Sequence, residues 1–526
     1  MGTYTKEQLT QELNRIQNAT TQCIAALEAR DIDVSPDAKL ADLASYVQFI
    51  CGNKADLRLE YIQAEETPSS AERTTVYFNT GLLIGRHTSI EISYQNTYNY
   101  TGTTENYSLL GCAQTTDASY SFTDDCFLAA PASDSGYKYA WGYKNNSDAT
   151  YSTDNSTRDT STHVLYVWPN RAAQGGSFSY TYDSFNVYYD DNTSVGIAKK
   201  GYFSSRRTYE LPLFIFGQNN NGSLDNSALK GTRIHYIKIY DSCNLVRFYI
   251  PVLHWVNNKY TPCFYDKVND TYIYNLGSGE LLYQTSDDEL LDSIIYPETG
   301  ATSAGFDTSI YIVTQGINID SKFSASSSIY NDSINQQCIV GYQYDDTYRY
   351  GLYCPMNKEE STDVAPYIGY AIPKPNTTYD YSAIEAQWDE DYAVSAFLAT
   401  LYSNVSENGV VVRGIYSNGN RAFIVDPQAL ESTNPTAGNH IFIFGNPDSS
   451  GGIVMAGTKV YYSCVTWTDQ NGLYLATYRA SLIPVLHNDV PCFYDLNRKI
   501  YITNSGTTDC NYSRLTPNRT HGNNWY

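Results

Sequence analysis

The chain has few basic residues and no long apolar run. Its 526 residues include 34 Lys and Arg against 56 Asp and Glu, which gives a formal net charge of −22. Because like charges repel and no basic stripe is visible, this balance argues against binding to nucleic acid or to an anionic membrane surface. No apolar run approaches the roughly 18 residues that span a bilayer, and the first residues lack a basic flank followed by a hydrophobic core. We therefore expect neither membrane insertion nor Sec-type export.

Motifs for catalysis and for metal binding are also missing. The 11 cysteines include no Cys-x-x-Cys pair, so they are interpreted as small buried hydrophobes rather than as disulfides or zinc ligands. His254 and His487 recur at equivalent places and are interpreted as satisfied core or sheet-edge residues. The acidic cluster around Glu385 and Asp389 lacks the Glu-x-Asp-x-x-Glu and Glu-x-Asp-x-Glu spacings of related glycoside hydrolases. We expect no enzymatic activity, no bound metal and no cofactor.

The most informative feature that is present is a pentapeptide that occurs twice. Pro262-Cys-Phe-Tyr-Asp266 recurs as Pro491-Cys-Phe-Tyr-Asp495, and each copy follows an Ile-Pro-Val-Leu-His segment. Further echoes pair Phe214–Gly217 with Phe442–Gly445, Gly231–Tyr236 with Gly457–Tyr462, and Thr74–Tyr77 with Thr308–Tyr311. The offsets lie between 226 and 234 residues, which is too long for a solenoid and close to one large all-β domain. We therefore predict a leader at residues 1–52, a first domain at 53–288 and a second domain at 289–526.

The composition predicts that both domains are built from strands. The chain contains 51 Tyr, and aromatic and β-branched side chains suit a half-buried pleated surface. Segments such as Thr88–Tyr94 and Gly231–Tyr240 alternate with a period near two, and polar turns such as Gln218–Gly222 separate them. Many short strands with frequent turn signals predict a mainly β fold of antiparallel sandwiches.

The leader is predicted to form a helical hairpin. Thr5-Lys-Glu-Gln8 fits a capping box, and the apolar residues that follow are spaced as on the a/d seam of a heptad repeat. Ser35-Pro36 starts a second helix. Two alternatives stay open: the helices pack on the first β domain, or they oligomerise or anchor the chain, which a narrow apolar stripe favours. The residues of this anchor are Leu9, Leu13, Ile16, Thr20, Cys23, Leu27, Leu40, Leu43 and Val47.

The run from Arg233 to Tyr283 carries a resemblance to a known family. Its segments Ile-Lys-Ile-Tyr-Asp, Leu-Val-Arg-Phe-Tyr-Ile-Pro-Val and Cys-Phe-Tyr-Asp-Lys-Val-Asn-Asp-Thr-Tyr-Ile-Tyr-Asn-Leu-Gly-Ser-Gly resemble the C-terminal half of laminin-G or concanavalin A-like jelly-roll domains in virion proteins of gut bacteriophages. The second copy, Lys459–Asn504, is degraded, with Asn-Ser-Gly-Thr in place of Asn-Leu-Gly-Ser-Gly. The leader, notably Asp33-Val-Ser-Pro-Asp-Ala-Lys-Leu-Ala-Asp-Leu, resembles the openings of phage fibre subunits of the crAss-like head-fibre type.

This resemblance implies two tandem jelly-roll sandwiches in a structural protein of a phage particle. Such a protein is made in the host bacterial cytoplasm and located on the virion surface, as a short head fibre or capsid decoration. Its partners are copies of itself, as a dimer or trimer, other virion proteins, and glycans of the host surface or of mucus. The alternatives are a tail-spike depolymerase that hydrolyses polysaccharide and a receptor-binding tail protein.

Aromatic residues on loops are the candidates for glycan contact, because flat rings stack on sugar faces. Four of them alternate in a Gly-containing stretch: Tyr137, Tyr139, Trp141 and Tyr143. A second group is Tyr98, Tyr100 and Tyr107. The same alternation is also typical of a strand with one aromatic face, and the sequence favours that interpretation.

Overall fold

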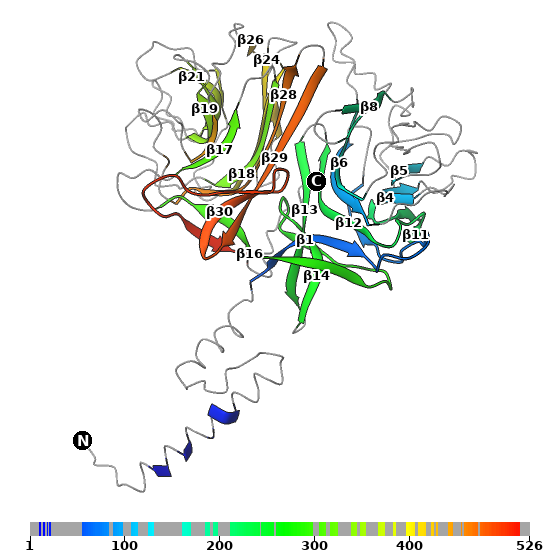
Figure 1. The fold of residues 1–526 in the computed structure, drawn as a ribbon. Coiled ribbons are helices and arrows are strands. Elements are labelled where there is room, and N and C mark those ends of the chain that lie inside the picture. The colour runs from blue at the N-terminus through cyan, green and yellow to red at the C-terminus, as the bar shows by residue number, and fades with distance from the viewer. Residues whose placement is uncertain are drawn as a thin grey trace.

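The structure, a computed structural model, contains two β-rich parts that lie side by side (Figure 1). It describes eight residues between Thr10 and Gln22 and then residues 55–83, 88–97, 107–113, 125–130, 160–169, 185–189, 193–197, 211–241, 244–256, 259–297, 305–311, 316–324, 338–343, 348–353, 367–373, 382–385, 396–404, 409–416, 422–424, 428–429, 440–444, 454, 457–471 and 474–515. The predicted mainly β fold of jelly-roll-type sandwiches is confirmed in these residues.

The first part is a sandwich of two sheets. The strands of its larger sheet are β1 (Leu57–Ala64), β3 (Thr88–Asn96), β6 (Thr162–Pro169), β7 (Phe185–Tyr189), β8 (Thr193–Ile197), β12 (Thr232–Asp241), β13 (Asn244–Val256), β14 (Lys259–Asp266), β15 (Thr271–Ile273) and the start of β16 (Leu281–Ile295). The facing sheet contains β2 (Phe78–Asn79), β4 (Tyr107–Ala113), β5 (Asp125–Ala130), β9 (Phe214–Ile215), β10 (Gln218–Asn220) and β11 (Ser223–Asp225).

The second part repeats this arrangement. Its larger sheet contains the end of β16, then β18 (Gly316–Ser324), β23 (Ala396–Asn404), β24 (Gly409–Tyr416), β25 (Ala422–Ile424), β26 (Gln428–Ala429), β28 (Lys459–Asn471), β29 (Tyr474–His487), β30 (Val490–Asp495), β31 (Ile500–Ile502) and β32 (Asn511–Arg514). Its facing sheet contains β17 (Phe306–Tyr311), β19 (Cys338–Gln343), β20 (Tyr348–Tyr353), β21 (Tyr367–Pro373), β22 (Ser382–Glu385) and β27 (His440–Ile443). The pairing of β18 with β28, β28 with β29 and β29 with β30 matches that of β3 with β12, β12 with β13 and β13 with β14.

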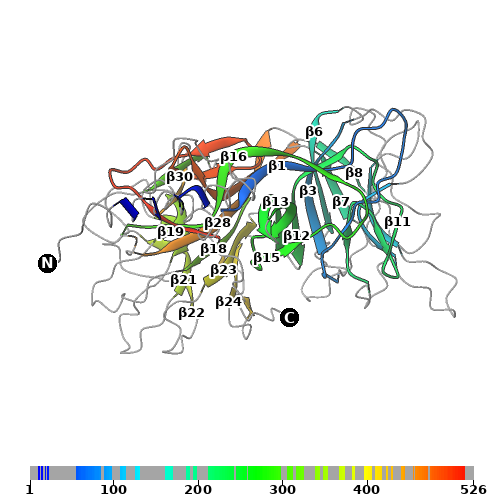
Figure 2. The same cartoon turned by 90° about the horizontal axis from the view of Figure 1, so that it is seen from below.

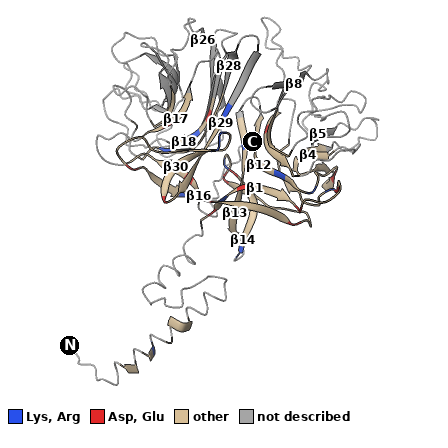
Figure 3. Cartoon of the chain, in the orientation of Figure 1, with Lys and Arg blue, Asp and Glu red and all other residues tan. Residues whose placement is uncertain are grey.

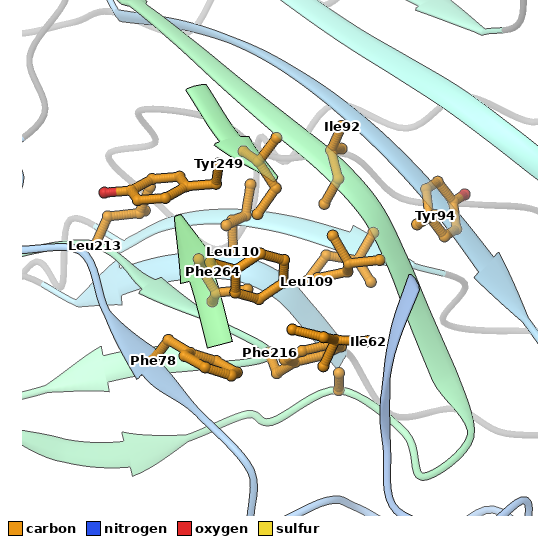
Figure 4. Packing of buried hydrophobic residues seen from close by; sticks show 14 of the residues in the cluster. Ile62, Phe78, Ile92, Tyr94, Leu109, Leu110, Leu213, Phe216, Tyr249 and Phe264 are labelled. Atoms are coloured by element: carbon orange, nitrogen blue, oxygen red, sulfur yellow. The ribbon is translucent and has the colours of Figure 1, made fainter. Parts of the chain in front are cut away.

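The core of the first sandwich lies between its two sheets (Figure 4). Phe78 of β2 packs edge-on against Phe264 of β14, with ring centroids 4.9 Å apart. Phe306 and Phe493 make the same contact in the second sandwich at 5.0 Å. The middle residue of each repeated pentapeptide is therefore a core residue of its own sandwich.

One strand, β16, belongs to both sandwiches. Its first residues pair with β1, and its last residues pair with β32 and β28. The predicted junction between residues 288 and 289 therefore falls inside a continuous strand, which Figure 2 shows running beside β1 between the two parts. Leu57 and Glu289 occupy equivalent positions, opposite Leu253 and Leu486, and they also pair with each other.

A second hydrophobic cluster fills the space between the sandwiches. It is formed by equivalent residues of both parts, including Cys263 and Tyr265 of β14 with Cys492 and Tyr494 of β30. These are the second and fourth residues of the pentapeptides, because alternate side chains of a strand point to opposite faces. At the ends of β14 and β30 the larger sheet of each sandwich is consequently buried on both faces.

The last residue of each pentapeptide organises a turn. Asp266 accepts hydrogen bonds from the backbone N–H groups of Phe248 and Val268, at 3.0 and 3.1 Å. Asp495 accepts the equivalent bonds from Ser481 and Asn497, at 2.9 and 3.0 Å. The repeated pentapeptide is therefore a scaffold element of each sandwich.

One of the predicted sequence echoes is misaligned. The structure matches Thr80, not Thr74, with Thr308, since both hydroxyls donate to backbone carbonyls at equivalent positions, Leu213 just before β9 at 2.8 Å and Ile441 in β27 at 2.6 Å. The segments Thr74–Tyr77 and Thr308–Tyr311 resemble each other only in composition. Their true register is set by Phe78 and Phe306, which pair with Ile215 and Ile443.

The helical hairpin of the leader is not confirmed. The eight described residues are helical, and in Figure 1 they lie apart from the β-rich parts. Thr20 is half-buried, whereas the other seven described residues are exposed. The remaining predicted anchor residues, and the whole second helix, lie outside the described residues.

Candidate functional site

The predicted glycan contacts fall largely outside the described part of the chain. Tyr137, Tyr139, Trp141 and Tyr143 are among the residues that the structure does not describe, as are Tyr98 and Tyr100. Tyr107 is described, and it is buried against Leu229 with the Arg73 guanidinium over its ring. Tyr107 is therefore a core residue of β4, which agrees with the favoured interpretation of a strand and not with a glycan contact.

A cluster of one aspartate, one histidine and one tyrosine lies at the junction of the two sandwiches and occurs twice. In the first copy, Asp56 lies just before β1, His254 lies near the end of β13 and Tyr272 lies in β15. The Asp56 carboxylate accepts from the Tyr272 hydroxyl at 2.5 Å and lies 2.6 Å from His254 Nδ1. The rings of His254 and Tyr272 stack with centroids 4.0 Å apart. Three strands thus hold one aspartate, one histidine and one tyrosine in mutual contact.

The second copy repeats these contacts with Asp288 of β16, His487 of β29 and Tyr501 of β31. Asp288 lies 2.8 Å from His487 Nδ1 and accepts from the Tyr501 hydroxyl at 2.9 Å. The two rings stack with centroids 3.8 Å apart. The shared set of contacts indicates that the cluster was part of the unit that was duplicated.

The two copies differ in a third contact to the aspartate. Arg58 donates to Asp288 from Nε at 3.2 Å and from a terminal nitrogen at 3.0 Å, and its guanidinium lies over the Tyr494 ring. Leu290 occupies the equivalent position beside Asp56, where its backbone N–H donates to the Asp56 carbonyl at 2.8 Å. Asp288 is therefore bound from both sandwiches.

The two copies also differ in solvent access. The side chain of His254 is 7% exposed and that of His487 is 36% exposed. In the first copy the β13–β14 hairpin continues past the histidine through the pairs Trp255 with Tyr260 and Val256 with Lys259, whereas in the second copy His487 already pairs with Val490 at the turn. The ring of Tyr274, 6.4 Å from that of His254, is a further neighbour of the buried histidine.

The clusters have the chemistry of hydrogen-bonded supports rather than of nucleophiles. Burial raises the pKa of the neighbouring Cys263 thiol well above its usual range and that of Cys492 to about 12. Thiols with such pKa values stay protonated at neutral pH and react slowly. Among the residues that the structure describes, no group of three or more His, Cys, Asp and Glu side chains is placed to hold a metal ion.

A buried ionic group stabilises the same interface. Lys238 Nζ and the Tyr236 hydroxyl lie 3.1 and 2.8 Å from Glu91 Oε1, and Arg479 of the second sandwich lies 3.5 Å from Glu91 Oε2. Burial by itself raises the pKa of Glu91, but Lys238 and Arg479 outweigh it and hold that pKa below its usual value. The carboxylate is therefore charged and links the two sandwiches.

Charge is otherwise dispersed over the described ribbon, where Figure 3 shows acidic and basic residues interspersed. No helix among the described residues combines the length and the apolar composition that crossing a membrane requires.

The sequence pointed to His254 and His487 but not to the aspartates and tyrosines that they contact. The predicted role of His254 and His487 as satisfied residues is confirmed by their contacts with Asp56 and Asp288. A usable signal was present, because Asp56 to Asp288 spans 232 residues and Tyr272 to Tyr501 spans 229, within the range of the other repeats. Of the 11 cysteines, five are described as free and buried, as predicted: Cys112, Cys263, Cys464, Cys492 and Cys510.

Comparison with known proteins adds one likeness. No family model matches the chain, and no curated protein matches it. A solved structure titled mouse laminin alpha1 chain, domains LG4-5, matches over 80% of this chain and 92% of its own length, with 11% identity and a TM-score of 0.24. A superposition this loose carries no argument about function.

Proposed function

We propose that this chain is a structural and adhesive subunit of a bacteriophage particle, a short fibre on the head. Its leader would oligomerise the chain or dock it onto another virion protein, and its two sandwiches would contact glycans of the host surface or of mucus. The sequence resemblance to gut-phage fibre proteins is the origin of this proposal. We propose no enzymatic activity, and a tail-spike depolymerase or a receptor-binding tail protein remains the alternative.

The observation that carries the proposal is the fusion of the two sandwiches. They share strand β16, a hydrophobic cluster with members from both, and the buried Arg58–Asp288 and Glu91–Arg479 pairs. A linker between independent domains would leave them free to move, whereas a buried interface of this kind holds them in one orientation. A stiff pair of sandwiches suits a fibre that must project from a surface.

The test of self-association uses the full chain. The substitutions Leu13→Glu and Ile16→Glu place charges on the predicted seam, while Asn14→Glu changes an exposed helical residue and serves as the control. Light scattering should report a dimer or trimer for the wild type and the control, and a monomer for the seam variant. A wild-type chain that is monomeric would exclude self-association and leave docking onto another virion protein.

A further inference from the structure

We propose that the open copy of the duplicated cluster, at Tyr501, is a contact for a neutral pyranose residue of a glycan. The inference rests on the proposed adhesive function and names the site and the ligand class. It concerns residues distinct from Tyr137, Tyr139, Trp141 and Tyr143.

Tyr501 is held in one orientation although much of it faces solvent. Its side chain is 38% exposed, yet its hydroxyl donates to Asp288 at 2.9 Å and its ring stacks on His487 and contacts Tyr494 at 4.9 Å. Burial and the Asp288 carboxylate raise the pKa of Tyr501 to about 12, so the hydroxyl remains a donor. A ring that is already immobilised loses little conformational entropy when a ligand stacks on it.

The surroundings of the ring combine apolar surface with hydrogen-bonding groups. Val490 pairs with His487 and is 50% exposed. Asn488, in the turn beside them, is exposed and donates from its amide to His487 Nε2 at 2.9 Å, which leaves its carbonyl oxygen as an acceptor. An apolar face bordered by a few polar groups is the surface that the C–H face and the hydroxyls of a pyranose ring require.

The first copy shows what a covered version of this surface looks like. There the His254 ring stacks on Tyr272 and also lies 6.4 Å from the ring of Tyr274. His254 is buried and Tyr272 is half-buried. The rings of the cluster are thus less accessible in the first copy than in the second.

Charge favours a neutral sugar over an acidic one. The chain carries a net charge of −22, and the exposed Asp489 belongs to the same turn as Asn488. An anionic glycan would be repelled on approach. A single ring contact gives weak binding, so useful adhesion would depend on several subunits acting together.

The experiment measures binding of the full-length protein to an array of immobilised neutral and acidic glycans. Tyr501→Ala should weaken binding to neutral glycans by about tenfold, which corresponds to about 1.4 kcal/mol. Tyr501→Phe keeps the ring and should stay within about threefold of wild type, a smaller loss than tenfold. Tyr283→Ala removes a tyrosine that is 42% exposed elsewhere and should change nothing. If Tyr501→Ala proves unstable, Tyr501→Leu keeps the apolar volume without the aromatic face and should show the same loss.

The outcomes separate this inference from the proposed function. If the wild type binds glycans and folded Tyr501→Ala and Tyr501→Leu bind equally well, adhesion stands and the Tyr501 site is wrong. If the wild type binds no glycan, the site and the adhesive function both fail. If the variants change the mass of the assembly instead of glycan binding, the surface is a protein contact and the inference is overturned.

Discussion

The Arg58–Asp288 pair makes a quantitative test of how the two sandwiches are joined. Arg58 is buried, as is Asp288, and the pair is linked by two hydrogen bonds at 3.2 and 3.0 Å. We choose Arg58→Leu because leucine occupies the equivalent position in the other copy, at Leu290, beside Asp56. The substitution leaves Asp288 with His487 and Tyr501 but without a cation.

Removal of one partner of a buried ion pair costs about 3 to 5 kcal/mol, because the other charge is left uncompensated. Since Asp288 keeps two hydrogen-bond donors, we expect a loss of about 3 kcal/mol in the free energy of unfolding. Urea titration followed by tryptophan fluorescence measures it. Adding Asp288→Asn removes the unpaired charge and should restore part of the loss.

The matched control is Arg514→Leu. Arg514 donates to Glu289 at 2.6 Å, but its side chain is 56% exposed, and exposed ion pairs contribute about 0 to 1 kcal/mol. A loss for Arg58→Leu that is no larger than that of the control would refute the argument that this buried pair joins the sandwiches.

Three further predictions concern groups near the interface. His235, whose pKa burial lowers from 6.5 to about 4, is neutral in the fold, so its contribution is present above pH 6.5 and is lost as pH falls towards 4. The pKa shift corresponds to about 3 kcal/mol in the free energy of unfolding, or about 2 kcal/mol once solvent contact of the half-buried ring is allowed for. His235→Gln should therefore reduce the fall in Tm between pH 6.5 and pH 4. A pH dependence of Tm that the substitution leaves unchanged would contradict this role of His235. Diethyl pyrocarbonate should modify His487 well before His254, as peptide mass spectrometry can measure, and equal rates would contradict the difference in exposure of the two side chains. Cys492 and Cys263 should react with a disulfide reagent at neutral pH after unfolding and scarcely before, so rapid reaction of the native protein would contradict their burial.

The repeat was readable from the sequence because it is carried by residues with demanding environments. Phe264 and Phe493 fill equivalent core positions, and Asp266 and Asp495 organise equivalent turns, so neither pair tolerates substitution easily. Strand content followed from composition and alternation. The match of Thr74–Tyr77 with Thr308–Tyr311 was wrong because Thr and Tyr are frequent throughout the chain. Short segments made of common residues recur by chance.

The contacts between distant segments at the junction of the two sandwiches could not be predicted from the sequence in the same way. Asp56 touches His254 across 198 positions of sequence, and Asp288 touches His487 across 199. Periodicity along a strand says which face a residue occupies but not which distant strand lies against that face. The double burial of the larger sheets was therefore not foreseen, although Cys263 and Tyr265 already marked the second apolar face.

Calorimetry of the full chain tests most directly the claim that the two sandwiches form one body. Because they share β16 and a buried interface, they should unfold in one transition whose calorimetric enthalpy equals the van't Hoff enthalpy. Two separate transitions, or a calorimetric enthalpy about twice the van't Hoff value, would show that the sandwiches unfold independently and would contradict the account.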